Sequence, residues 1–213
     1  RELNYPVTLI NSGDLNRANW NDIDVLILPD GKYPFLNNKD FSDLRNWISK
    51  GGKLIAMESA VAQLAGMEEG GIKFKKEGDD TAKKDSYAAL KKFGDHDRES
   101  ISSTTPGSIY KVQLDNSHPL AFGYPGYYYT LKMDDNVYEF INNGWNVGVI
   151  KKDNLVAGFV GSELKKKLND GVIYGVQDIG RGNIIYLADD VLFRNFWQNG
   201  KLMFCNALFM VGQ

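Results

Sequence analysis

The sequence feature that most constrains the fold is a glycine pair followed by a short apolar run and an abrupt change of pattern. Gly51 and Gly52 precede the apolar residues 54–57, and a segment rich in alanine and leucine, compatible with a helix, begins without a spacer. A short apolar run bounded by turn signals is typical of a buried parallel strand. The sequence therefore predicts a tight elbow between a strand and a helix, with Ser59 at the turn.

The residues around this elbow are the first candidates for a functional site. In α/β folds ligands bind at the carboxyl ends of parallel strands, and a side chain at a tight strand-to-helix turn is held out of the sheet. Glu58 precedes Ser59, while Asp30 and Gly31 follow an apolar strand predicted at residues 24–28. We expect these residues to gather at one edge of the sheet, Glu58 and Ser59 as catalytic candidates and all four as ligand-binding candidates.

Each of these candidates also has a purely structural interpretation. A serine becomes a useful nucleophile only beside a base, normally a histidine oriented by a carboxylate. His118, which precedes a proline, is the candidate base for Ser59. Alternatively, Ser59 is a small residue that fits the turn, and the Asp30 and Glu58 carboxylates cap helices instead of sharing a proton or binding a metal. We favour the second interpretation, in which the elbow is catalytically silent.

The remaining pattern predicts a parallel core with an antiparallel addition. Residues 6–10, 24–28, 54–57 and 183–187 are expected to form the parallel core strands. Short runs at residues 127–131, 137–141, 145–150 and 155–160, separated by turn residues, are typical of hairpins, and residues 172–176 and 183–187 are expected to form a further hairpin around the turn at Gly180. The expected fold class is α/β, a three-layer sandwich with a mostly parallel sheet and an antiparallel β section.

The composition is that of one globular domain. With 213 residues, 43% of them hydrophobic and 24% charged, the chain can bury a substantial core. We expect a single domain over residues 1–213, with a polar insertion at about residues 66–105 that contains a helix at residues 86–93. Because the chain opens at Arg1 and in the middle of a pattern, we also expect a fragment of a longer protein.

Charge and hydropathy argue against several classes of partner. A formal net charge of −2 gives no electrostatic reason to expect nucleic acid. No apolar run approaches the roughly 18 residues that span a bilayer.

No metal or other cofactor is expected in this domain. His96 and Glu99 match the spacing of two zinc ligands, but a third histidine at a suitable distance is missing, so we interpret the match as chance.

A set of aromatic residues offers a second kind of site. Aromatic rings can stack on sugars or contact a partner domain. Because neighbouring residues of a strand face opposite ways, three consecutive tyrosines cannot share one face, and part of the set is equally well explained as core. The set comprises Tyr124, Tyr127, Tyr128, Tyr129, Trp145 and Trp197.

The order of segments in the first half resembles the class I glutamine amidotransferase-like superfamily. The resemblance is carried by the strand ending in Leu28-Pro29-Asp30-Gly31, the helix with Trp47, the glycine pair and the elbow. It implies an amidotransferase-like or flavodoxin-like α/β fold. Active members of that superfamily carry a cysteine at the elbow and a histidine further along. This chain has Ser59 and Ala188-Asp189-Asp190 instead, which implies a degenerate site.

The second half resembles the C-terminal amidotransferase-like domain of bacterial zinc carboxypeptidases of the carboxypeptidase A type. Residues 107–112, 118–120, 180–190 and 193–201 carry this resemblance. It implies an upstream peptidase domain as partner, with zinc in that domain, and a parent that is secreted, periplasmic or associated with the cell envelope.

The function implied is that of a non-catalytic accessory domain, serving domain packing or recognition of substrate or envelope. Two alternatives stand beside it. One is a serine-dependent hydrolase or amidase that uses Ser59. The other is a carbohydrate- or peptide-binding module that uses the aromatic set.

Overall fold

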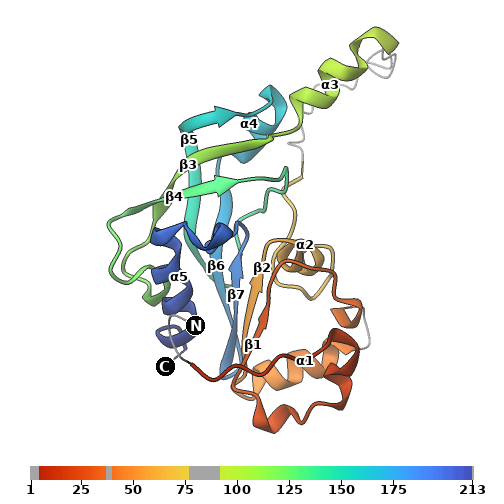
Figure 1. Ribbon diagram of the computed structural model, residues 1–213, viewed down its shortest axis with the longest axis vertical. Coiled ribbons are helices and arrows are strands. Elements are labelled where there is room, and N and C mark those ends of the chain that lie inside the picture. Colours follow the sequence, from red (N-terminus) through yellow and green to blue (C-terminus); the bar gives the residue numbers. More distant parts are fainter. Residues whose placement is uncertain (1–4, 37–39, 77–91, 213) are drawn as a thin grey trace.

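The computed structural model describes residues 5–36, 40–76 and 92–212, and within these ranges one seven-stranded sheet dominates. Its strand order is β1-β2-β7-β6-β5-β3-β4 (Figure 1). The strands are β1 (Val25–Leu28), β2 (Lys53–Met57), β3 (Gly107–Leu114), β4 (Tyr127–Lys132), β5 (Trp145–Phe159), β6 (Gly171–Ile179) and β7 (Gly182–Leu187). The α-helices are α1 (Asp40–Ser49), α2 (Ser59–Ala65), α3 (His96–Ser102), α4 (Ser162–Leu168) and α5 (Gln198–Phe209).

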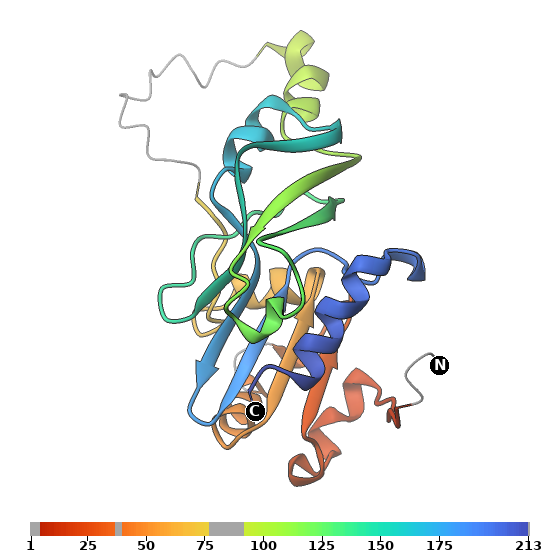
Figure 2. The same ribbon diagram turned by 90° about the vertical axis from the view of Figure 1, so that its left-hand side faces the viewer.

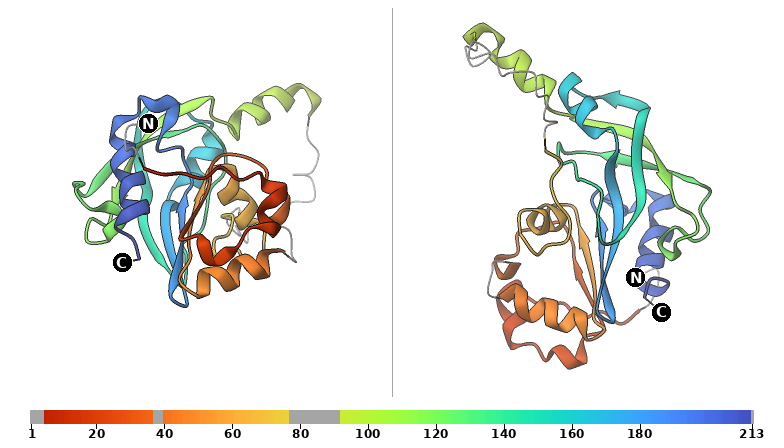
Figure 3. Two further views of the ribbon diagram at one scale, coloured as in Figure 1. Left: turned by 60° about the horizontal axis from the view of Figure 1, so that its bottom comes forward. Right: turned by 180° about the vertical axis from the view of Figure 1, so that it is seen from behind.

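Strands β1, β2 and β7 form a parallel end that is covered by helices on both faces (Figures 1 and 3). The alternating directions of the β2 side chains explain this arrangement. Leu54 and Ala56 pack in the cluster that contains α1 and α2, whereas Ile55 and Met57 pack in the cluster that contains α5. The prediction of a buried central strand at residues 54–57 is therefore confirmed.

The rest of the sheet is antiparallel. Strand β6 returns beside β7 through a tight turn at Gly180, as the sequence predicted, and β5, β3 and β4 follow in antiparallel pairs. The two runs expected at residues 145–150 and 155–160 join into the single strand β5, whose pairing with β3 shifts register. Residues 137–141 form no strand; Tyr138 makes only isolated bridges.

The expectation of a mostly parallel sandwich is wrong in its proportions. Two strand pairs of the described sheet are parallel and four are antiparallel. Residues 6–10, expected as a parallel core strand, form no strand, and Val7 and Leu9 are 71% and 93% exposed. Their apolar pattern is compatible with a strand, but β1 is the outermost strand of the described sheet. The coarser expectation, a mixed α/β fold with an added antiparallel section, is confirmed.

The segment expected as a polar insertion is partly integrated into the body. Ile72 is buried, and the Tyr186 hydroxyl donates to the Gly70 carbonyl oxygen at 2.9 Å. Helix α3 points away from the body (Figures 1 and 2). Most of the helix expected at residues 86–93 lies outside the described residues; Phe93 begins a short 3-10 turn, η5 (Phe93–Asp95). Every helix in the described ranges is too short or too polar to cross a lipid bilayer.

A buried ion pair closes the curled sheet. Lys132 is the last residue of the edge strand β4, and its Nζ lies 3.1 Å from Oδ1 of Asp189, which follows β7. Three strands separate β4 from β7 in the sheet order, so this contact exists only because the sheet curls back on itself (Figure 2). The Thr130 hydroxyl strengthens the junction by donating to Asp189 Oδ2 at 2.7 Å.

Replacing Gly182 with alanine is expected to destabilise the fold. A Cβ at this position would lie 2.2 Å from the carbonyl oxygens of Gly52 and Ile48, and backbone atoms cannot swing aside as a flexible side chain can. We expect a loss of about 2 kcal/mol in the free energy of unfolding, measured by urea denaturation.

Gly13→Ala is the matched control, because no atom lies within 4 Å of the added Cβ. It should change stability by less than roughly 0.5 kcal/mol. Equal stability of the two variants would contradict the close contact between the β6–β7 turn and the end of α1.

Candidate functional site at the elbow

The candidate site lies where β2 ends and α2 begins, at the carboxyl edge of the parallel strands (Figure 1). Asp30, Glu58 and Asp190 follow three neighbouring strands, β1, β2 and β7. Parallel strands bring such residues to a common edge, which is where α/β folds bind ligands. The acidic residues of this edge are therefore the starting point for its chemistry.

Glu58 occupies the strained position of the elbow. Its backbone has φ 45° and ψ −114°, a conformation that non-glycine residues rarely adopt. Its N–H donates to the Leu187 carbonyl oxygen at 3.0 Å, which ties the turn to β7. Ser59 comes one position later, as the first residue of α2. The side chain that a strained elbow presents to the edge of the sheet is thus a carboxylate, and the serine lies beside it.

The Ser59 hydroxyl is engaged by the loop that follows β1. Its Oγ accepts the Gly31 N–H at 2.8 Å, forms a short hydrogen bond with Asp30 Oδ1 and lies 3.0 Å from the Gly31 carbonyl oxygen. One turn later on α2, Gln63 Nε2 donates to the same Gly31 carbonyl at 2.7 Å. The serine and the glutamine together clamp the β1–α1 loop onto α2.

His118 lies at the opposite end of the sheet from the elbow. Its ring centroid is 6.1 Å from that of Trp145, whose indole N–H donates to Asp178 at 3.2 Å. Asp178 pairs with Asn183 at the beginning of β7, whereas the elbow lies beside the end of that strand. His118 Nδ1 accepts the Leu120 N–H at 3.1 Å, and burial lowers the pKa of the ring. The histidine caps a turn and has no access to the elbow serine.

The Glu58 carboxyl has the most unusual acidity of the site. Burial is the main cause that raises its pKa to about 7, and the carboxylates of Asp190, Asp30, Asp189 and Asp134 add repulsion. A carboxyl group that titrates near neutral pH is suited to proton transfer, and such groups are common at functional sites. They also occur where carboxylates are simply crowded together, so the pKa alone assigns no reaction.

A buried lysine neutralises part of this negative charge. Burial opposes the charge of Lys132, but the carboxylates of Asp189 and Asp134 outweigh it and hold the lysine pKa above its usual value. Complete burial raises the pKa of Asp189, while Lys132 and the Thr130 hydroxyl oppose that rise. Lys132 is therefore an ammonium group that bridges two aspartates beneath the elbow.

The described residues offer no metal site. Within residues 5–36, 40–76 and 92–212 there is no group of three or more His, Cys, Asp or Glu side chains arranged to hold an ion. His96 is exposed on α3, where its Nδ1 lies 3.3 Å from Asp97 Oδ1. The spacing of His96 and Glu99 thus corresponds to no metal cluster in this part of the chain.

The aromatic set separates into a core residue and two surface locations. Tyr128 is 2% exposed and packs against Tyr174, whereas Tyr127 and Tyr129 on the opposite face of β4 are 41% and 37% exposed. The rings of Tyr127 and Tyr129 are 5.7 Å apart, and the Trp197 indole donates to the Tyr129 carbonyl at 3.2 Å. We call Tyr127, Tyr129 and Trp197 the tyrosine surface. Half-buried Tyr124 lies edge-on to Tyr128, and Trp145 lies elsewhere, beside His118.

The sequence analysis did not identify two residues of the elbow region, Asp190 and Lys132, as candidates. Asp190 follows β7 but had been considered only as a replacement for a histidine. Lys132 stands two positions after Thr130 and four after Tyr128, on the inward-facing side of β4. That alternation was the available signal, because a lysine at an inward position of a strand requires a buried partner.

Comparison with known proteins supports the fold and no more. No family model matches the sequence, and no curated protein matches it. The cytoplasmic protein STM3548 of Salmonella typhimurium is similar in structure, with a TM-score of 0.50 and 12% identity over 97% of this chain and 77% of that chain. A ThuA-like protein from Parabacteroides merdae has a TM-score of 0.53 and 11% identity over 90% of this chain and 71% of that chain. ThuA-like proteins have the class I glutamine amidotransferase-like fold.

These similarities overturn the expected relationship to zinc carboxypeptidases. The similar structures are ThuA-like, and nothing in the comparisons links the chain to a carboxypeptidase. The segments that had suggested it, such as residues 180–190, form a hairpin and a strand end that belong to the framework of the fold. The upstream peptidase partner and its zinc have no other support, and the expectation of an exported parent rested on the same resemblance.

Glu58→Gln is expected to remove a pH dependence of stability. The folded-state pKa of about 7 lies above the ordinary value of 4.5, so the folded protein binds this proton more tightly than the unfolded chain does. Wild-type stability should therefore fall between pH 5 and pH 8, whereas the variant should lack this component. Allowing for partial exposure, the variant should be more stable by about 1–2 kcal/mol at pH 8 in urea denaturation.

Glu68→Gln serves as the control, because Glu68 is an exposed glutamate just after α2. Its pH profile should follow that of the wild type. If the stability of Glu58→Gln had the same pH profile as the wild type, the pKa of the Glu58 carboxyl would not be raised in the folded protein.

Proposed function

We propose that this domain is a non-catalytic recognition module with a degenerate amidotransferase-like site. The observation that carries the proposal is the clamped Ser59 hydroxyl, which Asp30 and Gly31 engage on the loop after β1. Acyl transfer at an elbow requires a nucleophile with an adjacent base. This elbow presents the Glu58 carboxylate at its strained position and a hydroxyl that already serves as a structural contact.

The base available to Ser59 also favours a non-catalytic elbow. The group bound to its hydroxyl is the Asp30 carboxylate. A carboxylate is a weaker base than imidazole and is poorly matched to deprotonating a hydroxyl. The Gly31 N–H also donates to Oγ, which holds the hydroxyl against the loop after β1. A serine-dependent hydrolase or amidase is therefore less well supported than a binding role.

A non-catalytic domain of this size acts through its surfaces. We propose packing against another domain, or recognition of a ligand, as its role in a longer protein. The strained backbone and the crowded carboxylates of the elbow lower stability, and proteins retain such features where they serve binding.

Ser59 is expected to be inert toward serine-directed reagents. Incubation with a fluorophosphonate probe should leave Ser59 unlabelled in mass spectrometry, and the chain should hydrolyse neither glutamine nor simple esters. Ser59→Ala should lower the free energy of unfolding by about 1–2 kcal/mol, because Asp30 and the Gly31 N–H lose a partner.

Ser59→Cys tests whether a better nucleophile at the elbow is enough for catalysis. It introduces the thiol of active amidotransferases at a position without a histidine, so we expect no glutaminase activity. Stoichiometric labelling of wild-type Ser59, or turnover of glutamine by the cysteine variant, would contradict a silent elbow.

The tyrosine surface supports a second candidate function, carbohydrate binding. Tyr127 and Tyr129 expose their rings on one face of the edge strand β4, and sugar rings stack on exposed aromatic faces. Lys111 Nζ covers one face of Tyr127 at 4.5 Å, so Tyr129, which is 37% exposed, is the ring to substitute. The Trp197 indole occupies the Tyr129 carbonyl, so this edge is less suited to adding a peptide strand.

Glycan-array binding would test this second candidate. If the tyrosine surface binds sugars, Tyr129→Ala should reduce the signal at least about fivefold, in line with the loss of one aromatic contact. Trp145→Ala is the control, since Trp145 is 53% exposed but lies outside the tyrosine surface. Equal binding by the two variants, or no glycan bound by the wild type, would eliminate this candidate.

A further inference from the structure

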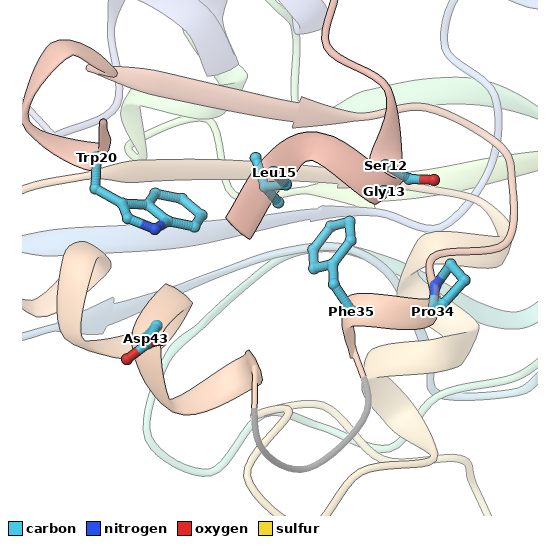
Figure 4. Close-up of a pocket in the computed structure, with 7 residues that line it drawn as sticks. All are labelled: Ser12, Gly13, Leu15, Trp20, Pro34, Phe35 and Asp43. Carbon is cyan, nitrogen blue, oxygen red and sulfur yellow. The ribbon is translucent and has the colours of Figure 1, made fainter. Parts of the chain in front are cut away.

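A hollow of about 220 Å³ lies between three 3-10 turns and α1, outside the elbow. The turns are η1 (Ser12–Arg17), η2 (Trp20–Asp22) and η3 (Pro34–Leu36). Figure 4 shows the rings of Trp20 and Phe35 on either side of Leu15, with Asp43 on the α1 side. The volume is below the roughly 300 Å³ at which drug-sized pockets begin, so a ligand here would be small.

The two aromatic side chains that line this hollow, Trp20 and Phe35, each pack against another ring. The Trp20 ring packs at 5.4 Å against Trp47, which is buried and donates its indole N–H to the Ile23 carbonyl at 2.9 Å. The Phe35 ring packs edge-on against Tyr33 at 5.7 Å.

Tyr33 is itself fixed on two sides. Its hydroxyl donates to the Pro29 carbonyl at 2.7 Å, and its N–H donates to Gln63 Oε1 at 2.8 Å. Little conformational entropy would therefore be lost when a ligand enters between Trp20 and Phe35, which is the condition for binding with few contacts.

The charge of the lining has one sign. Asp43 contributes a carboxylate, the remaining lining residues are Ser12, Gly13, Leu15, Trp20, Pro34 and Phe35, and none of these seven residues is basic. Arg17 of η1 is close in sequence, but its guanidinium is exposed and pairs with Asp14 at 3.7 Å. Aromatic faces attract cations through the negative potential over the ring, and the carboxylate adds a direct charge.

From this combination we infer that the hollow binds a small organic ammonium ion between Trp20, Phe35 and Asp43. A metal ion is a poorer match, because one carboxylate beside two rings supplies too few oxygen ligands. A neutral sugar or alcohol would gain nothing from the charge of the Asp43 carboxylate. The inference concerns a different part of the molecule from the proposed function, and neither depends on the other.

Choline and its neutral carbon analogue 3,3-dimethylbutan-1-ol are the probes that test this inference. Titration of the 213-residue chain, followed by the indole N–H resonance of Trp20 in proton–nitrogen NMR, should show saturable binding of choline at millimolar concentration. The neutral analogue should bind at least about fivefold more weakly, because it has the same shape without the charge. Raising the salt from 20 mM to roughly 300 mM should weaken choline binding further, as screening predicts.

Asp43→Asn and Asp22→Asn form the matched pair of variants. Both aspartates are exposed, but Asp22 lies on the adjacent turn η2 and does not line the hollow. Asp43→Asn should weaken choline binding about fivefold or more, and Asp22→Asn should leave it near the wild-type value. The inference is overturned if choline does not bind, if the neutral analogue binds equally well, or if the two variants behave alike.

Discussion

The ion pair between Lys132 and Asp189 is the contact on which the shape of the molecule depends. It joins the last residue of an edge strand to the end of β7, across a sheet in which three strands lie between them. Both groups are buried, so each charge depends on its partners, which are Asp189 and Asp134 for Lys132 and chiefly Lys132 for Asp189. The curl that brings them together also places Asp134 and Asp189 near Glu58, where their charges raise its pKa. Burial is the main cause of the raised pKa of Glu58, and the closure of the sheet adds to it through these two carboxylates.

The parts of the fold that the sequence predicted correctly are those set by local pattern. The buried strand at residues 54–57 and the hairpin around Gly180 follow from short-range signals, a glycine-bounded apolar run and a glycine-rich turn. The curl of the sheet and the continuity of β5 depend on contacts distant in sequence, which periodicity does not encode. Residues 6–10 show that a local pattern can also mislead. Their apolar sequence is typical of a strand, but they lie outside the sheet and Val7 and Leu9 are exposed.

The candidate site was predictable to a similar extent. Asp30, Gly31 and Ser59 do meet, because parallel strands end at one edge and the loop after β1 reaches α2. The role of Glu58 could not be read from the sequence, since the strained backbone falls one residue earlier than the small side chain suggested. His118 was a candidate by residue type alone. Its place at the far end of the sheet follows from the path of the antiparallel strands, which no local motif specifies.

The elbow also bears on how this chain can evolve. To acquire a thiol and a histidine of the kind found in active amidotransferases, this chain would need a cysteine at position 58 or 59 and a histidine after β7, in the segment that contains Asp189. If the histidine replaced Asp189, the buried Lys132 ammonium would keep only Asp134 as a charged partner; removing one member of a buried ion pair typically costs about 3–5 kcal/mol. A chain with this change would be less stable than the present one. The contact that shapes the sheet therefore opposes the introduction of a histidine at position 189.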